Sequence, residues 1–204
     1  MKNWFSENTS VILGTTFAVL LVPVIAFTQD AIFNPDQVHA TQLALLLSFI
    51  GAGMATAFPC LGSIMGVSMV GQAGAGLLTE KPELAGKVIT LNVLPGSQGL
   101  YGMVISLLFL FSYAPLISDP ATTVSTLQGF ILFSAFLPVT ITCLTSAPYQ
   151  AKVCAAGMHM LAKDGKLAGR VITMAALVET YALLGFLISF FMLNAFKASI
   201  IPVA

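Results

Sequence analysis

The sequence predicts an all-α membrane protein made of tandem duplicated transmembrane helical hairpins, four helices in all, plus an extra N-terminal hydrophobic segment. Apolar residues make up 57% of the 204 residues and charged residues only 8%, whereas soluble domains carry about 25% charged residues. The mean hydropathy is +0.95, several apolar segments are long enough to cross a bilayer, and the chain contains an internal repeat. This composition excludes a soluble domain, and a net charge of zero gives no reason to expect a nucleic-acid partner.

Charged residues mark the boundaries of five apolar segments, each near or above the ~20 helical residues that span a bilayer core. The segments are 10–28, 40–78, 88–113, 124–160 and 171–196. We expect the second and fourth to exceed the bilayer and to project beyond it as long helices. The predicted organisation is an N-terminal hydrophobic segment, a first hairpin and a second hairpin, at 1–39, 40–118 and 119–204.

The N-terminal segment is open to two interpretations. Lys2 precedes an apolar stretch, as in a signal peptide, but Pro23 interrupts that stretch and no clean A-x-A cleavage site follows. Residues 1–39 are therefore expected to be either a cleaved signal or a retained fifth helix.

The basic residues are distributed unevenly between the two predicted sides of the membrane. Seven lie on one side, namely Lys2, Lys81, Lys87, Lys152, Lys163, Lys166 and Arg170, and one, Lys197, lies on the other side with Asp30, Asp36 and Asp119. Cytoplasmic loops carry the excess of Lys and Arg. We therefore expect the loops near 79–87 and 162–170 to be cytoplasmic, and the loop near 114–123 and the C-terminus to be outside.

The two hairpins are copies of one another. Residues 84–110 and 167–193 align without gaps at an offset of 83 and share 12 of 27 residues. The preceding helices align at the same offset more weakly, pairing Cys60 with Cys143, Ser63 with Ser146 and Gly74 with Gly157. Because a unit of two spans returns the chain to its starting side, this is a direct repeat, unlike the inverted repeats of many secondary transporters.

The first helix of the repeat is rich in glycine, and the three cysteines all lie in apolar segments. Glycine occurs seven times, at Gly51, Gly53, Gly62, Gly66, Gly71, Gly74 and Gly76. Glycines allow close helix approach in lipid, either within one chain or between identical subunits of a ring, and their number favours a ring wall. The cysteines, Cys60, Cys143 and Cys154, have no CxxC or Cys/His spacing, and we interpret them as small packing residues.

Glu179 is the only charged residue between Val171 and Phe196. An ionised carboxylate at bilayer depth costs at least ~3 kcal/mol, and such residues usually face protein or a water path. Glu179 therefore predicts a protonatable or ion-binding site.

Other polar side chains are expected at the depth of Glu179. Pro95 lacks an N–H, so the carbonyl of Leu91 loses its helical partner and the helix should kink. Ser97 and Gln98 follow this break, and Gln150 lies in the first helix of the second hairpin. Taken singly, the glutamines fit interhelical hydrogen bonding. Together with one carboxylate, the neutral oxygens indicate a pocket for a small hard cation.

Two motifs resemble a known family. LPGSQGLYG at 94–102 and VETYALLGF at 178–186 closely resemble the membrane rotor subunit of bacterial and archaeal V-type ATPases, called c, K or the proteolipid, and the similarity extends over about residues 44–196. In its sodium-translocating type, the resemblance implies Na⁺ bound by Glu179, Gln98, Gln150, the Ser97 hydroxyl and the Leu94 carbonyl, with Tyr101 hydrogen-bonded to the carboxylate.

The resemblance also implies what the protein does. It implies a homo-oligomeric ring in the lipid of the cell membrane that carries Na⁺ on Glu179, with a stator membrane subunit and the central shaft of a soluble ATPase sector as partners. ATP hydrolysis or synthesis would take place in that sector, because this chain has no phosphate loop and is not itself an enzyme. Two alternatives stay open: the same ring carrying H⁺, and a small ion channel or secondary carrier.

Overall fold

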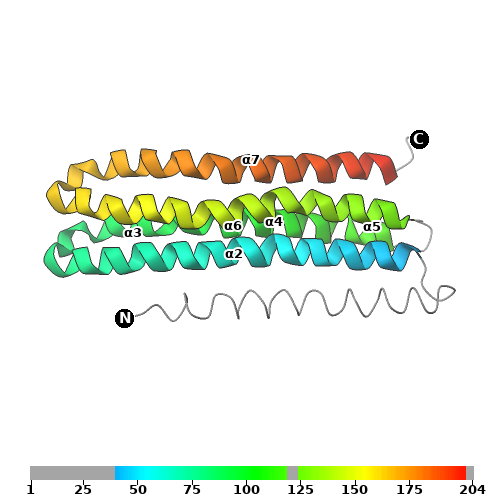
Figure 1. Cartoon of the computed structure of the whole chain (residues 1–204), viewed down its shortest axis with the longest axis horizontal. Helices are drawn as coiled ribbons and strands as arrows, with labels where there is room; N and C mark the ends of the chain where they lie inside the picture. The colour runs from blue at the N-terminus through cyan, green and yellow to red at the C-terminus, as the bar shows by residue number, and fades with distance from the viewer. Residues whose placement is uncertain (1–39, 119–123, 201–204) are drawn as a thin grey trace.

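The computed structural model describes residues 40–118 and 124–200, which form a bundle of long helices (Figure 1). The first hairpin comprises α2 (Ala40–Glu80), η1 (Pro82–Leu84), α3 (Ala85–Val93), η2 (Leu94–Gly96), α4 (Ser97–Ser112) and α5 (Ala114–Ser118). The second comprises α6 (Thr126–Lys163), η3 (Gly165–Leu167) and α7 (Ala168–Ile200). Within the described residues, four helical stretches are long and apolar enough to cross a membrane. The predicted segment 10–28 lies outside the described residues.

All four spans are longer than a bilayer requires, which corrects the prediction that only two are. The first and third have 39 and 38 residues, as expected, but the second and fourth have 36 and 33, against about 20 needed. The prediction failed because it started the two shorter apolar segments after Lys87 and Arg170. Both residues lie inside helices, in α3 and α7. A long basic side chain on a helix can keep its charged end in water, so a charge marks the edge of the apolar stretch and not the end of the helix.

The connections at one end of the bundle are tight. Pro82 follows the C-terminus of α2 and occupies the first turn of η1, where its missing N–H is tolerated. The Lys81 ammonium donates a hydrogen bond to the carbonyl of Ala162, near the C-terminus of α6. This bond joins the connection of one hairpin to a helix end of the other, and a cation there also interacts favourably with the helix dipole.

The first helix of the second hairpin has a well-defined start. The Ser125 hydroxyl accepts from the Gln128 N–H at 3.2 Å, and the Gln128 side chain accepts from the Ser125 N–H at 2.8 Å. This reciprocal pair is a capping box, which satisfies two backbone donors that a helix start leaves without partners.

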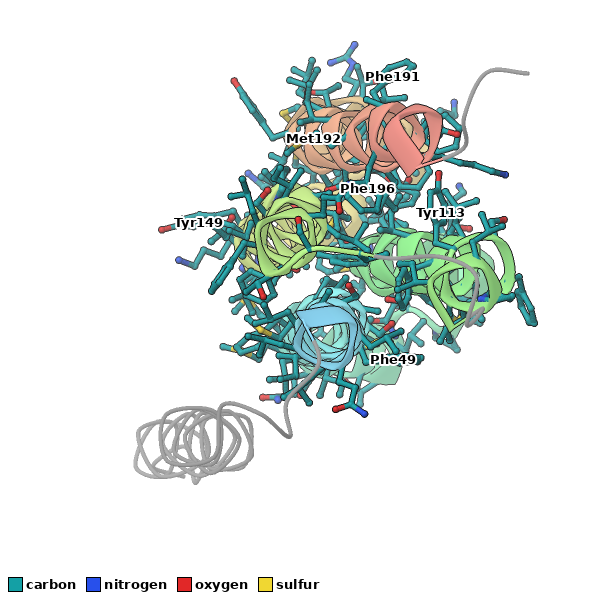
Figure 2. The ribbon with its side chains drawn as sticks, turned by 90° about the vertical axis from the view of Figure 1, so that its right-hand side faces the viewer. Phe49, Tyr113, Tyr149, Phe191, Met192 and Phe196 are labelled. Atoms are coloured by element: carbon teal, nitrogen blue, oxygen red, sulfur yellow. The ribbon has the colours of Figure 1, made fainter. Side chains whose placement is uncertain are left out.

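The two hairpins lie side by side in the same direction. In Figure 1 the α2–α3 and α6–α7 connections lie at one end and the C-terminus at the other. Figure 2, looking along the bundle, shows α2 and α7 on opposite sides with α6 and α4 between them. The direct repeat is thus confirmed as two hairpins of one orientation. The basic residues of both connections gather at one end, and their cytoplasmic placement stays a prediction.

The predicted break at Pro95 is present. The second span is divided into α3 and α4 by the 3₁₀ turn η2, with Pro95 at its second position, whereas α7 runs without interruption from Ala168 to Ile200. Because proline removes one helical hydrogen bond and crowds the preceding turn, the helix tightens locally here. The break is therefore a property of the first hairpin alone.

The buried apolar residues form two clusters, one toward each end of the bundle. One contains Ile105, Phe109 and Phe136, and the other contains Leu91, Met158 and Leu161. Cys143 belongs to the first cluster and Cys154 to the second, as expected of packing residues, whereas Cys60 is only partly buried and belongs to neither cluster. The gap between the clusters contains the polar residues described below.

Glycines of α2 serve packing inside the chain more than the sequence suggested. A Cβ at Gly62 would lie 2.6 Å from the carbonyl oxygen of Leu144 on α6, and one at Gly66 would lie 2.7 Å from Pro95 Cβ. Gly53 and Gly76 have nothing within 4 Å, so they remain open to a neighbouring molecule. The close approach of α2 to α6 thus explains part of the glycine-rich face without a second copy of the chain.

Candidate site at Glu179

A polar layer separates the two apolar clusters of the bundle. Gln98 on α4 and Gln150 on α6 are both completely buried. The Gln98 amide nitrogen donates to the Gln150 side-chain oxygen at 2.6 Å. Because a buried amide without partners is costly, this bond accounts for how two glutamines are accommodated inside a membrane-length bundle.

Glu179 projects from α7 into this layer and is half-buried. Its Oε1 accepts hydrogen bonds from the Ser97 hydroxyl at 2.7 Å and the Tyr101 hydroxyl at 2.6 Å, both on α4. Its Oε2 accepts from the Gln150 amide nitrogen at 3.2 Å. The partners that hydrogen-bond this carboxylate in the described chain are all neutral, so they orient it without cancelling its charge.

Ser97 lies among more acceptors than its single proton can satisfy. Its oxygen is 2.7 Å from Glu179 Oε1, 2.9 Å from the Leu94 carbonyl and 3.5 Å from Gln98 Oε1. The Leu94 carbonyl is directed there because Leu94 begins the 3₁₀ turn that precedes Ser97. A hydroxyl donates only one hydrogen bond, so this corner of the layer has an excess of oxygen atoms, which is the environment that a hard cation requires.

Gln150 offers nitrogen, not oxygen, to the carboxylate in this structure. Its amide nitrogen also donates to the Ala175 carbonyl at 3.2 Å, and its oxygen is occupied by Gln98. The amide therefore stabilises a negative Glu179 directly. To present its oxygen to a bound cation, the Gln150 amide would have to turn over about its terminal bond.

The residues predicted for the site come together from both hairpins. Leu94, Ser97, Gln98 and Tyr101 belong to η2 and α4, whereas Gln150 and Glu179 belong to α6 and α7. Each hairpin alone holds only part of the constellation. Among the described residues there is no group of three or more His, Cys, Asp or Glu side chains that could hold a metal ion, so a transition-metal centre is not supported there.

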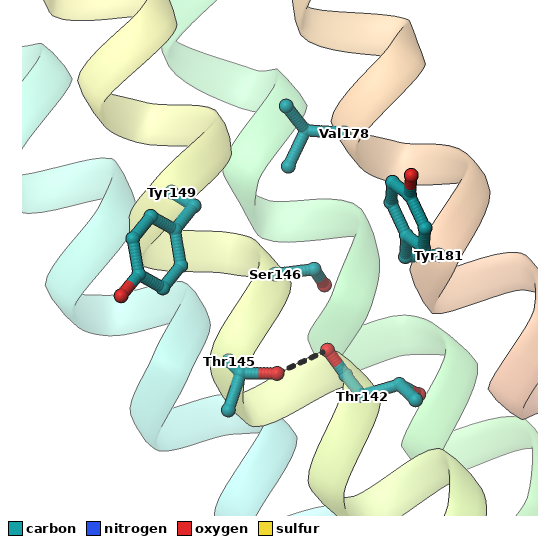
Figure 3. Close-up of a pocket in the computed structure, with 6 residues that line it drawn as sticks. All are labelled: Thr142, Thr145, Ser146, Tyr149, Val178 and Tyr181. Carbon is teal, nitrogen blue, oxygen red and sulfur yellow. Dashed lines mark hydrogen bonds between the residues drawn. The ribbon is translucent and has the colours of Figure 1, made fainter.

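Some polar side chains on α6 and α7 lie away from this constellation. Tyr181, two residues after Glu179, is 64% exposed and lines a groove of about 390 Å³ between α6 and α7 (Figure 3). Ser146 also lines this groove, and within the described chain its buried hydroxyl has no hydrogen-bond partner. His159 is exposed on α6 near the connecting end, and His39 lies outside the described residues.

Sequence reasoning missed one residue beside the site. The hydroxyl of Ser63 on α2 accepts a hydrogen bond from the backbone N–H of Gly99 at 2.9 Å. Its only signal in the sequence was the alignment with Ser146, which indicates a repeat and not a contact.

Comparison with known proteins agrees with the duplication. The family model for the C subunit of ATP synthase matches residues 50–109 and again 133–192, so the two matches are offset by 83 residues, as in the internal repeat.

Three curated relatives illustrate the similarity. The chain is 44% identical over 152 residues to the V-type sodium ATPase subunit K of Enterococcus hirae, covering 74% of this chain and 93% of the relative. It is 33% identical over 156 residues to the A-type ATP synthase subunit K of Methanocaldococcus jannaschii, covering 76% and 66%. It is 27% identical over 143 residues to the 16 kDa proteolipid of the V-type proton ATPase of Nephrops norvegicus, covering 70% and 87%.

Proposed function

Because this chain belongs to the family of ATP synthase C subunits, as a non-catalytic K/c-type rotor subunit in the membrane sector of a V/A-type ATPase, we propose that it carries Na⁺ on Glu179. The observation that carries this proposal is the excess of oxygen atoms around the Ser97 hydroxyl, next to a single carboxylate. A proton needs one acceptor, whereas Na⁺ needs several oxygens at once.

The proposed ligands are Glu179, Ser97, Gln98, Gln150 and the Leu94 carbonyl, and Tyr101 steadies the carboxylate. Support comes from the 2.6–2.9 Å contacts that join Glu179, Ser97, Tyr101 and Leu94. The 44% identity to a protein named as a sodium ATPase subunit supports the same ion.

Ion binding changes the charge of the site and one side-chain orientation. One Na⁺ on one carboxylate is close to neutral overall, which lowers the cost of facing lipid. When Na⁺ enters, the Gln150 amide turns so that its oxygen faces the cation, and its bond to Glu179 Oε2 is lost.

Transport follows from assembly and rotation. Identical copies form a ring, and each copy exchanges Na⁺ at a stator subunit whose cationic group offsets the empty carboxylate. The basic connections of both hairpins contact the central shaft of the soluble ATPase sector, where ATP is hydrolysed or made. One charge moved across 100 mV corresponds to about 2.3 kcal/mol. The movement of a few ions therefore corresponds to the free energy of hydrolysing or making one ATP.

A proton ring is the second candidate. The 27% identity to a proton ATPase proteolipid favours it, and the acidic residue serves either ion. The two candidates differ in what they require of Gln98 and Gln150, which a proton ring needs only for packing.

Labelling of Glu179 by a hydrophobic carbodiimide tests the choice between ions. The reagent is applied to the intact complex at fixed pH while Na⁺ is increased, with K⁺ at equal ionic strength as the control. Protection by Na⁺ at millimolar concentration or below, and not by K⁺, is the expected result. Labelling that depends on pH and ignores Na⁺ would reject sodium and favour the proton ring.

A further inference from the structure

We propose that Ser63 is a positioning residue for the ion site: it provides, from α2, the N-terminal cap that the interrupted helix α4 lacks. This inference rests on the proposed function, because the site that it positions is the one built around Glu179. It adds Ser63 on α2 to the residues on α4, α6 and α7 that form the site, although Ser63 itself does not hydrogen-bond the carboxylate.

The start of α4 has no cap of its own. The N-cap residue is Gly96, which has no side chain, and no side-chain cap bond occurs there. A helix start leaves its first N–H groups without partners, and an N-cap serine normally accepts from the second or third of them. Counting from Gly96, the third is Gly99.

Ser63 supplies that bond from another helix. Its hydroxyl oxygen lies 2.9 Å from the Gly99 nitrogen, and it also lies 3.5 Å from the Gly96 carbonyl oxygen, a weaker contact. Ser63 is only 8% exposed. A Cβ on Gly99 would lie 3.3 Å from the Ser63 hydroxyl, so the absence of a side chain at Gly99 leaves room for this close approach.

The cap acts on the residues that meet Glu179. Leu94 and Ser97 bracket Gly96, and both supply oxygens to the crowded corner of the site. Holding Gly99 and Gly96 against α2 therefore fixes the turn from which the Leu94 carbonyl and the Ser97 hydroxyl project. Loosening that turn would move both oxygens relative to the carboxylate while leaving Glu179 itself in place.

The repeat provides a matched control. Ser146 is the equivalent of Ser63 at the offset of 83, and it is as buried, at 6% exposed. Its neighbour α7 is continuous, so there is no helix start to cap, and within the described chain its hydroxyl has no partner. The same Ser→Ala change at two equivalent, buried positions thus removes a cap in one hairpin and no hydrogen bond in the other.

The experiment compares Ser63→Ala with Ser146→Ala in the intact complex reconstituted into vesicles. For Ser63→Ala, we expect the Na⁺ concentration that half-protects Glu179 from a hydrophobic carbodiimide to rise roughly fivefold, the size of a typical cap loss. The KM for Na⁺ in ATP-driven uptake should rise by the same factor, with the rate at saturating Na⁺ unchanged. Ser146→Ala should change neither quantity.

Each other outcome has a defined meaning. Equal shifts in both variants, no shift in Ser63→Ala, or a lower rate at saturating Na⁺ with an unchanged KM would overturn the positioning role. If Na⁺ does not protect the wild-type protein, the sodium function fails. The cap is then judged by the labelling rate without Na⁺ at one pH, which must be faster in Ser63→Ala than in Ser146→Ala.

A second variant covers failure of assembly. If Ser63→Ala yields no intact complex, Ser63→Cys keeps the side-chain size but makes a weaker hydrogen bond. It should shift the Na⁺ midpoint in the same direction by a smaller factor, and an unshifted midpoint would overturn the proposal.

Discussion

The two hairpins share their packing and differ in their chemistry. In the first hairpin, Gly102 of α4 lies directly against the carbonyl of Ala55 on α2. In the second, Gly185 of α7 lies against the carbonyl of Pro138 on α6. Both pairs are related by the offset of 83, so the duplicated chain has kept the contact that sets the distance between the helices of each hairpin.

The difference between the hairpins lies one and a half turns away from those glycines. Gly96 in the first hairpin corresponds to Glu179 in the second, and the broken turn at Pro95 corresponds to an unbroken helix. One copy provides the Leu94 carbonyl and neutral side chains, and the other provides the charge. Duplication thus places the interrupted helix and the half-buried carboxylate in different hairpins.

Removing the charge of the second hairpin is the most severe test of this difference. Glu179→Gln preserves size and keeps one oxygen that can accept from Ser97 and Tyr101, but it leaves no carboxylate, so ATP-driven ion uptake into vesicles should fall to background. Assembly, checked by native electrophoresis, should be unaffected, because the partners of Glu179 are neutral. A variant that still transports would refute the central role of this residue.

Gln150 tests whether the neutral partners matter as a set. Gln150→Ala removes one of the proposed oxygen ligands of Na⁺, which we take to contribute about 2 kcal/mol to ion binding, the size of a hydrogen bond to a charged group. We expect the Na⁺ midpoint in the carbodiimide assay to rise about thirtyfold. An unchanged midpoint, with Gln98→Ala equally silent, would contradict the oxygen pocket and return both glutamines to a packing role.

The shared glycines test the part of the comparison that is symmetric. Gly102→Ala and Gly185→Ala should destabilise the subunit by similar amounts, about 1–2 kcal/mol each, because a methyl group would meet a backbone carbonyl that cannot move freely. The measurement is the denaturation midpoint of the purified protein in detergent.

Gly53→Ala is the control for these two variants, since nothing lies within 4 Å of a Cβ there, and it should not lower the midpoint, because alanine is the better helix former. Clearly unequal effects of the two test variants would show that the hairpins do not share this packing constraint.

Tyr101 should give the smallest effect. Tyr101→Phe removes one of three donors to the carboxylate and keeps the ring, which packs against Phe186 at 5.8 Å between centroids. A hydrogen bond to a charged group contributes about 1.5–3 kcal/mol, but this bond supports the carboxylate both with and without Na⁺, so most of its energy cancels and the Na⁺ midpoint should change only about threefold. A change as large as that of Gln150→Ala would mean that the hydroxyl is a ligand and not a support.

The sequence predicted the features that depend on composition and covalent structure. The apolar runs, the repeat and the break at Pro95 follow from the hydrophobic effect, from duplication and from the missing N–H of proline. Glu179, Ser97, Gln98 and Gln150 were predicted together because one carboxylate in an apolar segment requires polar neighbours, whereas Leu94 and Tyr101 came from the resemblance to the rotor-subunit family.

Other features depend on tertiary contacts that no local pattern encodes. The cap from Ser63 requires α2 to lie against the start of α4, and a serine inside a helix looks the same with or without that contact. The nitrogen that Gln150 presents to Glu179 depends on the acceptor that Gln98 takes. The true starts of the second and fourth spans were missed because Lys87 and Arg170 are compatible with a continuing helix.

The presence of one carboxylate for every two hairpins sets the number of ions that the proposed ring moves in one turn. In the proposed ring, one turn moves as many ions as there are chains, although each chain contributes the four described spans to the circumference. A ring of equal girth built from hairpins that each had an acid would move twice as many ions per turn. With fewer ions for each revolution, the same torque can drive each ion against a steeper gradient. A ring of this duplicated subunit would therefore build a larger ion gradient but move fewer ions per turn.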